Sequence, residues 1–412
     1  KQNTGANALG FIDFIYPDQN CILDLTMDLK IFISPHDEEL YKEAHGTNSF
    51  LNSIQANINS MPDYESADIA LIGVEEERGS TSNKGTASAS IEIRKKLFQL
   101  KKGTGRYNIV DLGNLRSGIN LEETLGRLTE VCHILIENNV LPVIMGGSQD
   151  LDYGQYKAYQ GMDKLISLLN IDAFLDMEES DDQPNSINHI HKILLHEPNY
   201  LFNYSHLAYQ SYLIDQNAID ILEKLYFEAY RIGHLRSNIT EMEPIVRNAD
   251  MLTFDISAIK SSDAPGNGMA HPFGLTGEEA CQICWYAGIN EKLSSIGFYD
   301  YNPTFDDPSK KTASVVATMI WYFVEGFYHR KNEQNFKTND YLKFVVSLQG
   351  DPDSMNFYKS KLSEKWWLEV PYPQGKDKYA RNCIIPCSYK DYETATKGEL
   401  PERYITTHAK LL

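Results

Sequence analysis

The sequence has few cysteines, a shortage of basic residues and no long apolar segment. Only 6 of its 412 residues are cysteine, and Lys plus Arg number 38 against 57 Asp plus Glu. A disulfide scaffold is therefore not expected, and a net charge of −19 argues against partners that need a basic face, such as nucleic acid or an anionic membrane surface. No run of about 18 apolar residues is present, so no membrane-spanning helix is expected. Residues 1–6 also lack the apolar region of a signal peptide. Together these absences predict a soluble, cytoplasmic protein.

Short apolar runs alternate with segments of helical periodicity along most of the chain. Runs typical of buried strands are Ile69–Gly73, Leu141–Met145, Leu165–Leu169, Met251–Phe254 and Ser295–Phe298, and helical segments are Ala87–Leu100, Leu121–Asn139, Gly277–Ala287 and Thr312–Tyr328. This alternation is typical of a parallel sheet with helices on both faces. The predicted fold is therefore a three-layer α/β/α domain.

Polar residues follow three of these strands at the point where each one ends. Asp172 and Asp176 follow the Leu165 run, Gly146–Asp150 follows the Leu141 run, and Asp255 opens a segment that continues to Gly266. In open α/β sheets the ligand crevice lies beyond the carboxyl ends of the strands. We therefore expect these three segments to form one site.

As a set, the three segments resemble the ureohydrolase superfamily of arginase, agmatinase and formimidoylglutamase. The family pattern is Gly-Gly-Asp-His, then Asp-Ala-His-x-Asp, then Ser-Phe-Asp-x-Asp leading to Ala-Pro-Gly, and its His and Asp residues hold two manganese ions. By this resemblance, which covers about residues 67–328, Asp172, Asp176 and Asp255 stand at three of the six ligand positions.

The other three ligand positions are substituted. Gln149 and Phe174 stand where the family has His, and Ser257 stands where it has Asp. The three retained carboxylates raise each other's pKa unless something neutralises them. One interpretation is a residual cation site, which all-oxygen ligands would direct toward Mg²⁺ or Ca²⁺. We favour the other, an inherited cleft whose carboxylates are hydrogen-bonded or paired with a lysine such as Lys260.

Two further residues occupy positions that matter in the family. His189 is the nearest candidate for the histidine that shuttles protons there, although it and His191 also fit ordinary surface residues. Asp300 lies where the family often has a Glu that holds the substrate's guanidinium, and its shorter side chain changes the reach. A structural loop is the simpler interpretation of that segment.

The chain continues for roughly 85 residues beyond the family pattern. We expect residues 1–330 to form the main domain, with residues 1–66 as a lead-in segment, and residues 331–412 to form a C-terminal extension packed on it. The apolar run Tyr341–Leu348 predicts a strand that could be added at the edge of the main sheet. Trp366 and Trp367 are expected to lie in the core of the C-terminal extension. A small-molecule ligand and a homo-oligomer are the partner classes expected.

Two smaller patterns have simple structural interpretations. Cys281–Cys284 and Cys383–Cys387 have spacings that suggest a four-cysteine zinc site, but the first pair lies in a helical segment where cysteines usually fill apolar space. Thr276 and Glu279 have the spacing of a helix capping box.

Two functional hypotheses follow, and they leave open whether the chain is an enzyme. In the first, it is a ureohydrolase relative that no longer cleaves guanidino or amidino compounds and acts as a binding or interaction protein with no cofactor. In the second, it hydrolyses non-peptide carbon–nitrogen bonds of guanidino or formimino compounds with manganese or another divalent cation in an altered site, to which Gln149 and Asp150 would contribute oxygens.

Overall fold

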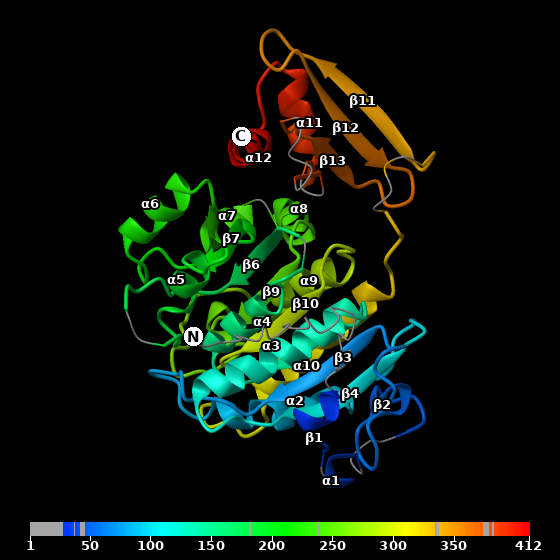
Figure 1. Ribbon diagram of the computed structural model, residues 1–412, viewed down its shortest axis with the longest axis vertical. Coiled ribbons are helices and arrows are strands. Elements are labelled where there is room, and N and C mark those ends of the chain that lie inside the picture. The colour runs from blue at the N-terminus through cyan, green and yellow to red at the C-terminus, as the bar shows by residue number, and fades with distance from the viewer. Residues whose placement is uncertain are drawn as a thin grey trace, which may run out of the picture.

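A computed structural model describes residues 28–412 except 37, 42–45, 163, 181–182, 238, 334–335, 337, 374–378 and 381–382. Its main feature is a ten-stranded sheet in the order β1-β4-β3-β5-β10-β9-β6-β7-β8, with β2 also paired to β4. The strands are β1 Ile33–Ser34, β2 Gln55–Ala56, β3 Ile69–Val74, β4 Ile109–Leu115, β5 Leu141–Met145, β6 Ile166–Ile171, β7 Leu201–Tyr209, β8 Glu228–Arg231, β9 Met251–Asp255 and β10 Ser295–Tyr299 (Figure 1).

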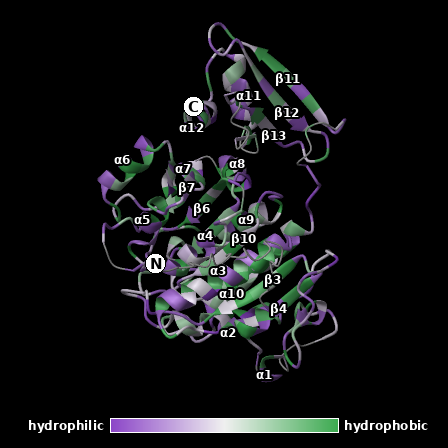
Figure 2. Ribbon diagram, viewed as in Figure 1, coloured by the Kyte–Doolittle hydropathy of each residue, from purple (hydrophilic) through white to green (hydrophobic). Residues whose placement is uncertain are grey.

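All strand pairs of this sheet are parallel except β1 with β4. The central strands are buried along their whole length, as expected when helices cover both faces. In Figure 2, β3 and β4 are mostly in the hydrophobic colour, whereas the outlying helix α6 (Gln216–Lys224) alternates between the two colours. The three-layer α/β/α fold predicted from the sequence is confirmed.

Helices cover the two faces of the sheet and create two separate cores. One core contains side chains of α2 (Ala89–Leu97), α7 (Ile232–Ser237), α8 (Met242–Arg247), α9 (Gly277–Gly288) and α10 (Lys311–Phe327), and the other contains those of α3 (Leu121–Glu137), α4 (Asp152–Lys157), α5 (His189–Leu194) and α6. Successive β3 residues contribute to opposite cores, Leu71 to the first and Ile72 to the second, as the two-residue period of a strand requires.

The long helices begin and end close to the limits predicted from periodicity. The expected capping box at the start of α9 is confirmed, with the Thr276 hydroxyl accepting from the Glu279 backbone and the Glu279 carboxylate accepting from the Thr276 backbone. Helices α9 and α10 approach closely at Gly288, where an added Cβ would lie 2.2 Å from the Phe323 carbonyl oxygen. Glycine is therefore required at this crossing.

The lead-in segment contributes an edge to the main sheet. Strands β1 and β2 both pair with β4, and α1 (Glu38–Tyr41) lies between them in the chain. The first part of the expected lead-in, residues 1–27, lies outside the described residues.

The described residues after Asp340 form a second, four-stranded antiparallel sheet with two helices, which we call the C-terminal module. Its elements are β11 Tyr341–Ser347, β12 Ser354–Ser360, β13 Trp366–Glu369, β14 Ile384–Cys387, α11 Tyr389–Thr396 and α12 Glu402–Leu411. The proposed extension of the main sheet by Tyr341–Leu348 is wrong, because β11 pairs with β12 from Tyr341 to Ser347. A local hairpin closes a much shorter loop than pairing with the distant main sheet would.

The C-terminal module packs on the main domain through polar contacts and through its own core. Arg247 of α8 donates to the carbonyl oxygen of Trp366 at 3.1 Å, and Arg403 of α12 forms an ion pair with Glu241 at 3.2 Å. Phe202 of β7 joins the apolar cluster of the module. In Figure 1 the module, in orange and red, lies at the top of the main domain, and the blue lead-in lies at the opposite end.

Among the described helices, none combines the length and the apolar character needed to cross a membrane.

Candidate functional site

The residues expected at the site come together at the carboxyl edge of the main sheet. Gln149 follows β5, Asp172 follows β6, Asp255 ends β9 and Asp300 follows β10, and β5, β10, β9 and β6 are consecutive neighbours. In the parallel pairing of β9 with β10, Asp255 lies beside Tyr299, the residue before Asp300. The convergence predicted from the strand ends is therefore present in the structure.

Asp172 is fully buried and receives hydrogen bonds from its neighbours. Its Oδ1 accepts from the hydroxyl of Ser257 at 2.8 Å and from the backbone N–H of Phe174 at 3.0 Å. Ser257 replaces a carboxylate of the family pattern, and its hydroxyl here is a donor to a carboxylate. The substitution thus exchanges a negative charge for a hydrogen-bond donor.

Gln149 reaches the same carboxylates with its side-chain amide. Its Nε2 can face Asn170 at 2.8 Å, but that orientation turns the amide oxygen toward two carboxylates. In the reversed orientation, Nε2 donates to Asp172 Oδ2 at 2.9 Å and to Asp255 Oδ2 at 3.1 Å, and the amide oxygen faces Asn170. The reversed orientation gives both carboxylates a donor, and its amide oxygen, which lies at Asn170 Oδ1, finds a donor when the Asn170 amide is reversed as well. The amide nitrogen then bridges Asp172 and Asp255.

Asp255 and Asp300 are also held by donors from the surrounding loops. Asp255 Oδ1 accepts from the Ser257 backbone at 2.5 Å, and Asp300 accepts from the Gln149 backbone at 2.9 Å and from the Asn83 side chain at 3.0 Å. Asp300 has a φ of 62°, a left-handed conformation that Asp tolerates better than most residues. Its carboxylate is engaged within the protein.

Burial makes the carboxyl groups of the site hard to ionise. It raises the pKa of Asp172 well above the usual value, and the charges of Asp255 and Asp176 raise it further. The pKa of Asp255 is also raised well above the usual value, by burial and then by the charge of Asp300. Burial raises the pKa of Asp300 to about 6. Hydrogen-bond donors are therefore needed wherever these groups carry charge.

His189 is buried beside the carboxylates rather than at the surface. Its Nδ1 lies 2.9 Å from both carboxylate oxygens of Asp152, and its Nε2 lies 3.4 Å from Asp176 Oδ2. Burial disfavours the charged imidazolium, but the charges of Asp152 and Asp176 outweigh burial and raise the His189 pKa well above 6.5. A protonated His189 supplies a positive charge among the carboxylates of the site. We call these carboxylates, Asp152, Asp172, Asp176, Asp255 and Asp300, the acidic cluster.

Phe174 is partly exposed and lines a small cavity above the carboxylates. The cavity has a volume of about 70 Å³ and is lined by Ser82, Asn83, Phe174, Asp176, Ser186, Ile187, Asp255, Ser257, Asn267, Met269 and Asp300. The suggested pairing with Lys260 is wrong, since its amine lies 3.3 Å from Asp263 instead.

Three functional positions were not identified from the sequence. Asp152 holds His189, Asn83 binds Asp300, and Asn267 donates to the Asp300 carbonyl at 3.0 Å. Asp152 lies three residues after Gln149 and Asn83 lies in the loop after β3, so both follow strand ends. A systematic list of polar residues after every strand would have included them.

The residues present do not fit a binuclear manganese centre. Phe174 offers no lone pair, and the amide of Gln149 and the hydroxyl of Ser257 point donors at the carboxylates that a metal would need. No three or more His, Cys, Asp or Glu side chains in the described part of the chain are grouped so as to hold a metal ion. The four cysteines of the suggested zinc site, which all lie in the described part of the chain, form no such group either.

The strand order, the cleft at the carboxyl edge and the retained Asp172, Asp176 and Asp255 define a ureohydrolase-type α/β protein. More specifically, the chain belongs to the arginase family, whose sequence model matches residues 67–325.

Similar proteins include several formimidoylglutamases. The chain is 25% identical over 288 residues to the formimidoylglutamase of a Geobacillus species, covering 64% of this chain and 84% of the relative. It is 26% identical over 298 residues to that of Streptococcus gordonii, covering 67% and 88%. Among solved structures, Trypanosoma cruzi formiminoglutamase with two manganese ions matches with a TM-score of 0.61 and 20% identity, over 66% of this chain and 97% of that one. Bacillus subtilis formimidoylglutamase matches with a TM-score of 0.59 and 19% identity, over 66% and 93%.

Proposed function

We propose that this arginase-family chain is a binding or interaction protein that does not hydrolyse ureohydrolase substrates. The observation that carries the proposal is the pair of donors, the Gln149 amide and the Ser257 hydroxyl, aimed at Asp172 and Asp255. In the family pattern these two carboxylates are metal ligands. In this chain protein donors occupy acceptor positions of both carboxylates, which supports a cluster held by hydrogen bonds in place of a metal.

Loss of the metal removes the usual source of a nucleophile. A metal ion lowers the pKa of a bound water to near 7, whereas free water has a pKa of 15.7 and is a poor nucleophile at neutral pH. His189 does not replace the metal, because its two ring nitrogens already face Asp152 and Asp176.

The cavity above the cluster is also smaller than a typical small-molecule site. Small-molecule sites usually measure about 300–1,000 Å³, and this one measures about 70 Å³. Phe174 occupies wall space at a position where the family has a metal-ligating His. The shape of the site therefore supports a function that depends on the fold and surface rather than on turnover.

The alternative is a metal-dependent hydrolase of non-peptide carbon–nitrogen bonds with an altered ligand set. It requires oxygens of Gln149 and Asp150 to replace the missing ligands. The reversed orientation of Gln149 turns its nitrogen, not its oxygen, toward Asp172 and Asp255, which weighs against that ligand set.

Metal analysis and activity assays test the proposal directly. Protein purified with Mn²⁺ supplied should contain no stoichiometric manganese, and it should release no formamide, urea or ammonia from formimidoylglutamate, arginine or agmatine above background. Turnover that is lost in Asp172→Ala would establish the hydrolase alternative. Bound manganese without turnover would show that these residues do bind metal, and it would agree with the proposed lack of hydrolytic activity.

A triple reversion tests the physical reason for the missing metal. Gln149→His, Phe174→His and Ser257→Asp together restore the family's ligand types. The three retained carboxylates, Asp172, Asp176 and Asp255, complete the set of six. We expect this variant to bind two Mn²⁺ ions with little or no turnover, because the groups that orient metal-bound imidazoles are typically worth 10–100-fold in affinity. Calorimetry that detects no binding to a folded triple variant would show that the cleft no longer has the geometry of the family site.

A further inference from the structure

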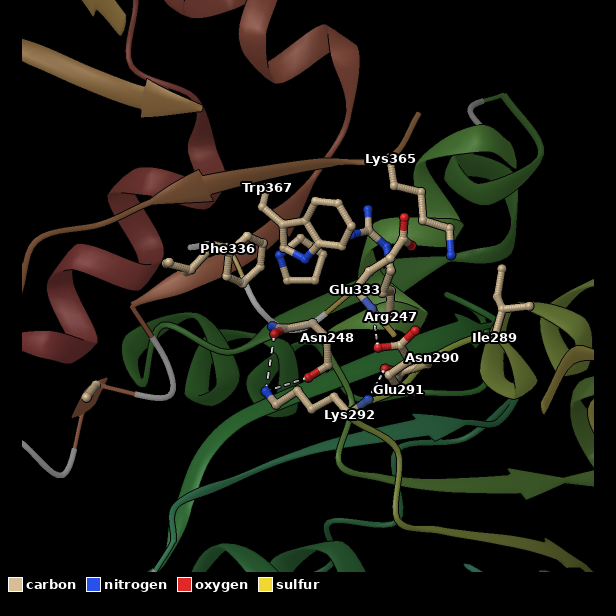
Figure 3. A pocket seen from close by; sticks show the side chains of 13 residues that line it. Arg247, Asn248, Ile289, Asn290, Glu291, Lys292, Glu333, Phe336, Lys365 and Trp367 are labelled. Atoms are coloured by element: carbon tan, nitrogen blue, oxygen red, sulfur yellow. Dashed lines mark hydrogen bonds between the residues drawn. The ribbon is translucent and has the colours of Figure 1, made fainter. Parts of the chain in front are cut away.

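A second cavity lies between the main domain and the C-terminal module, at the opposite edge of the sheet from the acidic cluster. It has a volume of about 250 Å³ and is lined by Arg247, Asn248, Ile289, Asn290, Glu291, Lys292, Glu333, Phe336, Lys365, Trp367, Ala380, Ile384 and Pro386. Asn248 and Lys292 precede β9 and β10, whereas Asp255 and Asp300 stand at the other ends of those strands. Figure 3 shows Trp367 and Lys365 above the cavity and Lys292 below it.

The cavity has a cationic side built around Arg247. The guanidinium lies over the ring of Trp367, with its central carbon 4.3 Å from the ring centroid, and its Nε forms an ion pair with Glu243 at 2.7 Å. Its buried Nη1 has no hydrogen-bond partner among the described residues. Lys365 lies 3.7 Å from the same Glu243, so two cations share one carboxylate. This side retains capacity to bind an anionic group.

Two carboxylates, Glu291 and Glu333, also line the cavity. Glu291 accepts from the backbone N–H groups of Lys331 and Glu333 at 3.0 and 2.6 Å, and Glu333 accepts from Ser360. Each carboxylate has about four acceptor positions, so both keep capacity for another donor. The wall therefore offers both signs of charge.

The rest of the lining is apolar and suits a hydrophobic group better than water. Phe336 and Trp367 lie in edge-to-face contact with centroids 5.4 Å apart, and Ile289, Ile384 and Pro386 complete this part of the wall. Ala380 is exposed, so the lining reaches the protein surface.

We propose that this cavity binds a small zwitterion with an apolar side chain, that is, a free amino acid of the phenylalanine or leucine type. The carboxylate of the ligand meets Arg247 and Lys365, its ammonium meets Glu291 and Glu333, and its side chain packs on Phe336 and Trp367. Because the site lies at the junction, the ligand binds only when the C-terminal module is docked and therefore stabilises that arrangement. The inference does not depend on the proposed function of the acidic cluster.

A ligand series on the full-length protein tests each part of the recognition. Calorimetry with L-phenylalanine, phenylpropionate and phenylethylamine compares the zwitterion with a molecule lacking the ammonium and one lacking the carboxylate. We expect L-phenylalanine to bind at least tenfold more tightly than either analogue, since each lost contact is a charge-assisted hydrogen bond. Equal binding by phenylpropionate, or no binding by any of the three, would overturn the proposal.

Variants locate the binding in this cavity. Lys365→Met and Arg247→Lys should each weaken L-phenylalanine binding by about tenfold. Lys359→Met is the matched control, because Lys359 lies near Trp366 and not on the cavity wall, and it should bind like the natural chain. Unchanged binding by folded Lys365→Met would place the ligand elsewhere and refute the assignment, and if Arg247→Lys fails to fold, the ligand series still decides the chemistry.

Discussion

Removal of one hydroxyl, in Ser257→Ala, tests whether hydrogen bonding has replaced the metal in the acidic cluster. Ser257 is 2% exposed and its Oγ donates to Asp172 Oδ1 at 2.8 Å. After the substitution, this oxygen keeps only the backbone N–H of Phe174. The variant introduces no charge and removes only one oxygen, so its effect reports on this bond.

The expected loss of stability follows from the burial and charge of the acceptor. A buried hydrogen bond contributes about 1 kcal/mol between neutral groups and about 1.5–3 kcal/mol when one group is charged. Since burial raises the Asp172 pKa well above its usual value, both protonation states are relevant. The predicted loss is therefore about 1–3 kcal/mol, and it grows as the pH rises because the charged form of Asp172 then gains weight.

A matched pair of variants makes the measurement specific. Ser262 forms the same type of bond to Asp263 Oδ1 at 2.9 Å, but at an exposed site. Urea unfolding of Ser262→Ala should differ from the natural chain by less than about 0.5 kcal/mol. If Ser257→Ala is no more destabilising than Ser262→Ala, the idea that this hydroxyl compensates the buried carboxylate is refuted.

Three other predictions concern the rest of the molecule. Arg94→Met should cost about 3–5 kcal/mol in urea unfolding, because it removes the guanidinium whose Nε lies 2.8 Å from the buried Asp111 carboxylate and leaves only the His36 ring, at 3.1 Å, as a side-chain partner; a loss below 1 kcal/mol would contradict this. Limited proteolysis of the native protein should spare the strands of the C-terminal module, whose Phe357 and Leu368 are fully buried, and rapid cleavage there would contradict the packing. Burial lowers the pKa of Lys410 from 10.5 to about 8, so the unfolded chain binds more protons between these values. The stability of the natural chain relative to Lys410→Met should therefore rise with pH through that window, by at most about 3 kcal/mol because the side chain keeps some solvent contact; a difference that does not change with pH would refute the shift.

The sequence by itself determined the layers of the main domain and the place of the site. Apolar runs with helices between them specify a parallel sheet, because a run buried on both faces needs a helix layer on each side. Parallel strands end at a common edge, so Asp172 and Asp255 could be placed together without coordinates. The three substituted positions, Gln149, Phe174 and Ser257, were also visible from the family pattern alone.

Only the tertiary structure decided what the substituted side chains do and where the additional strands pair. That Gln149 and Ser257 direct donors at the carboxylates depends on distances of about 3 Å between residues far apart in the chain. That His189 is buried against Asp152, rather than exposed, depends on how α5 packs against α4. An apolar strand such as Tyr341–Ser347 is compatible with many partners. Its pairing with β12 reflects a local hairpin and an aromatic core, which strand periodicity does not encode.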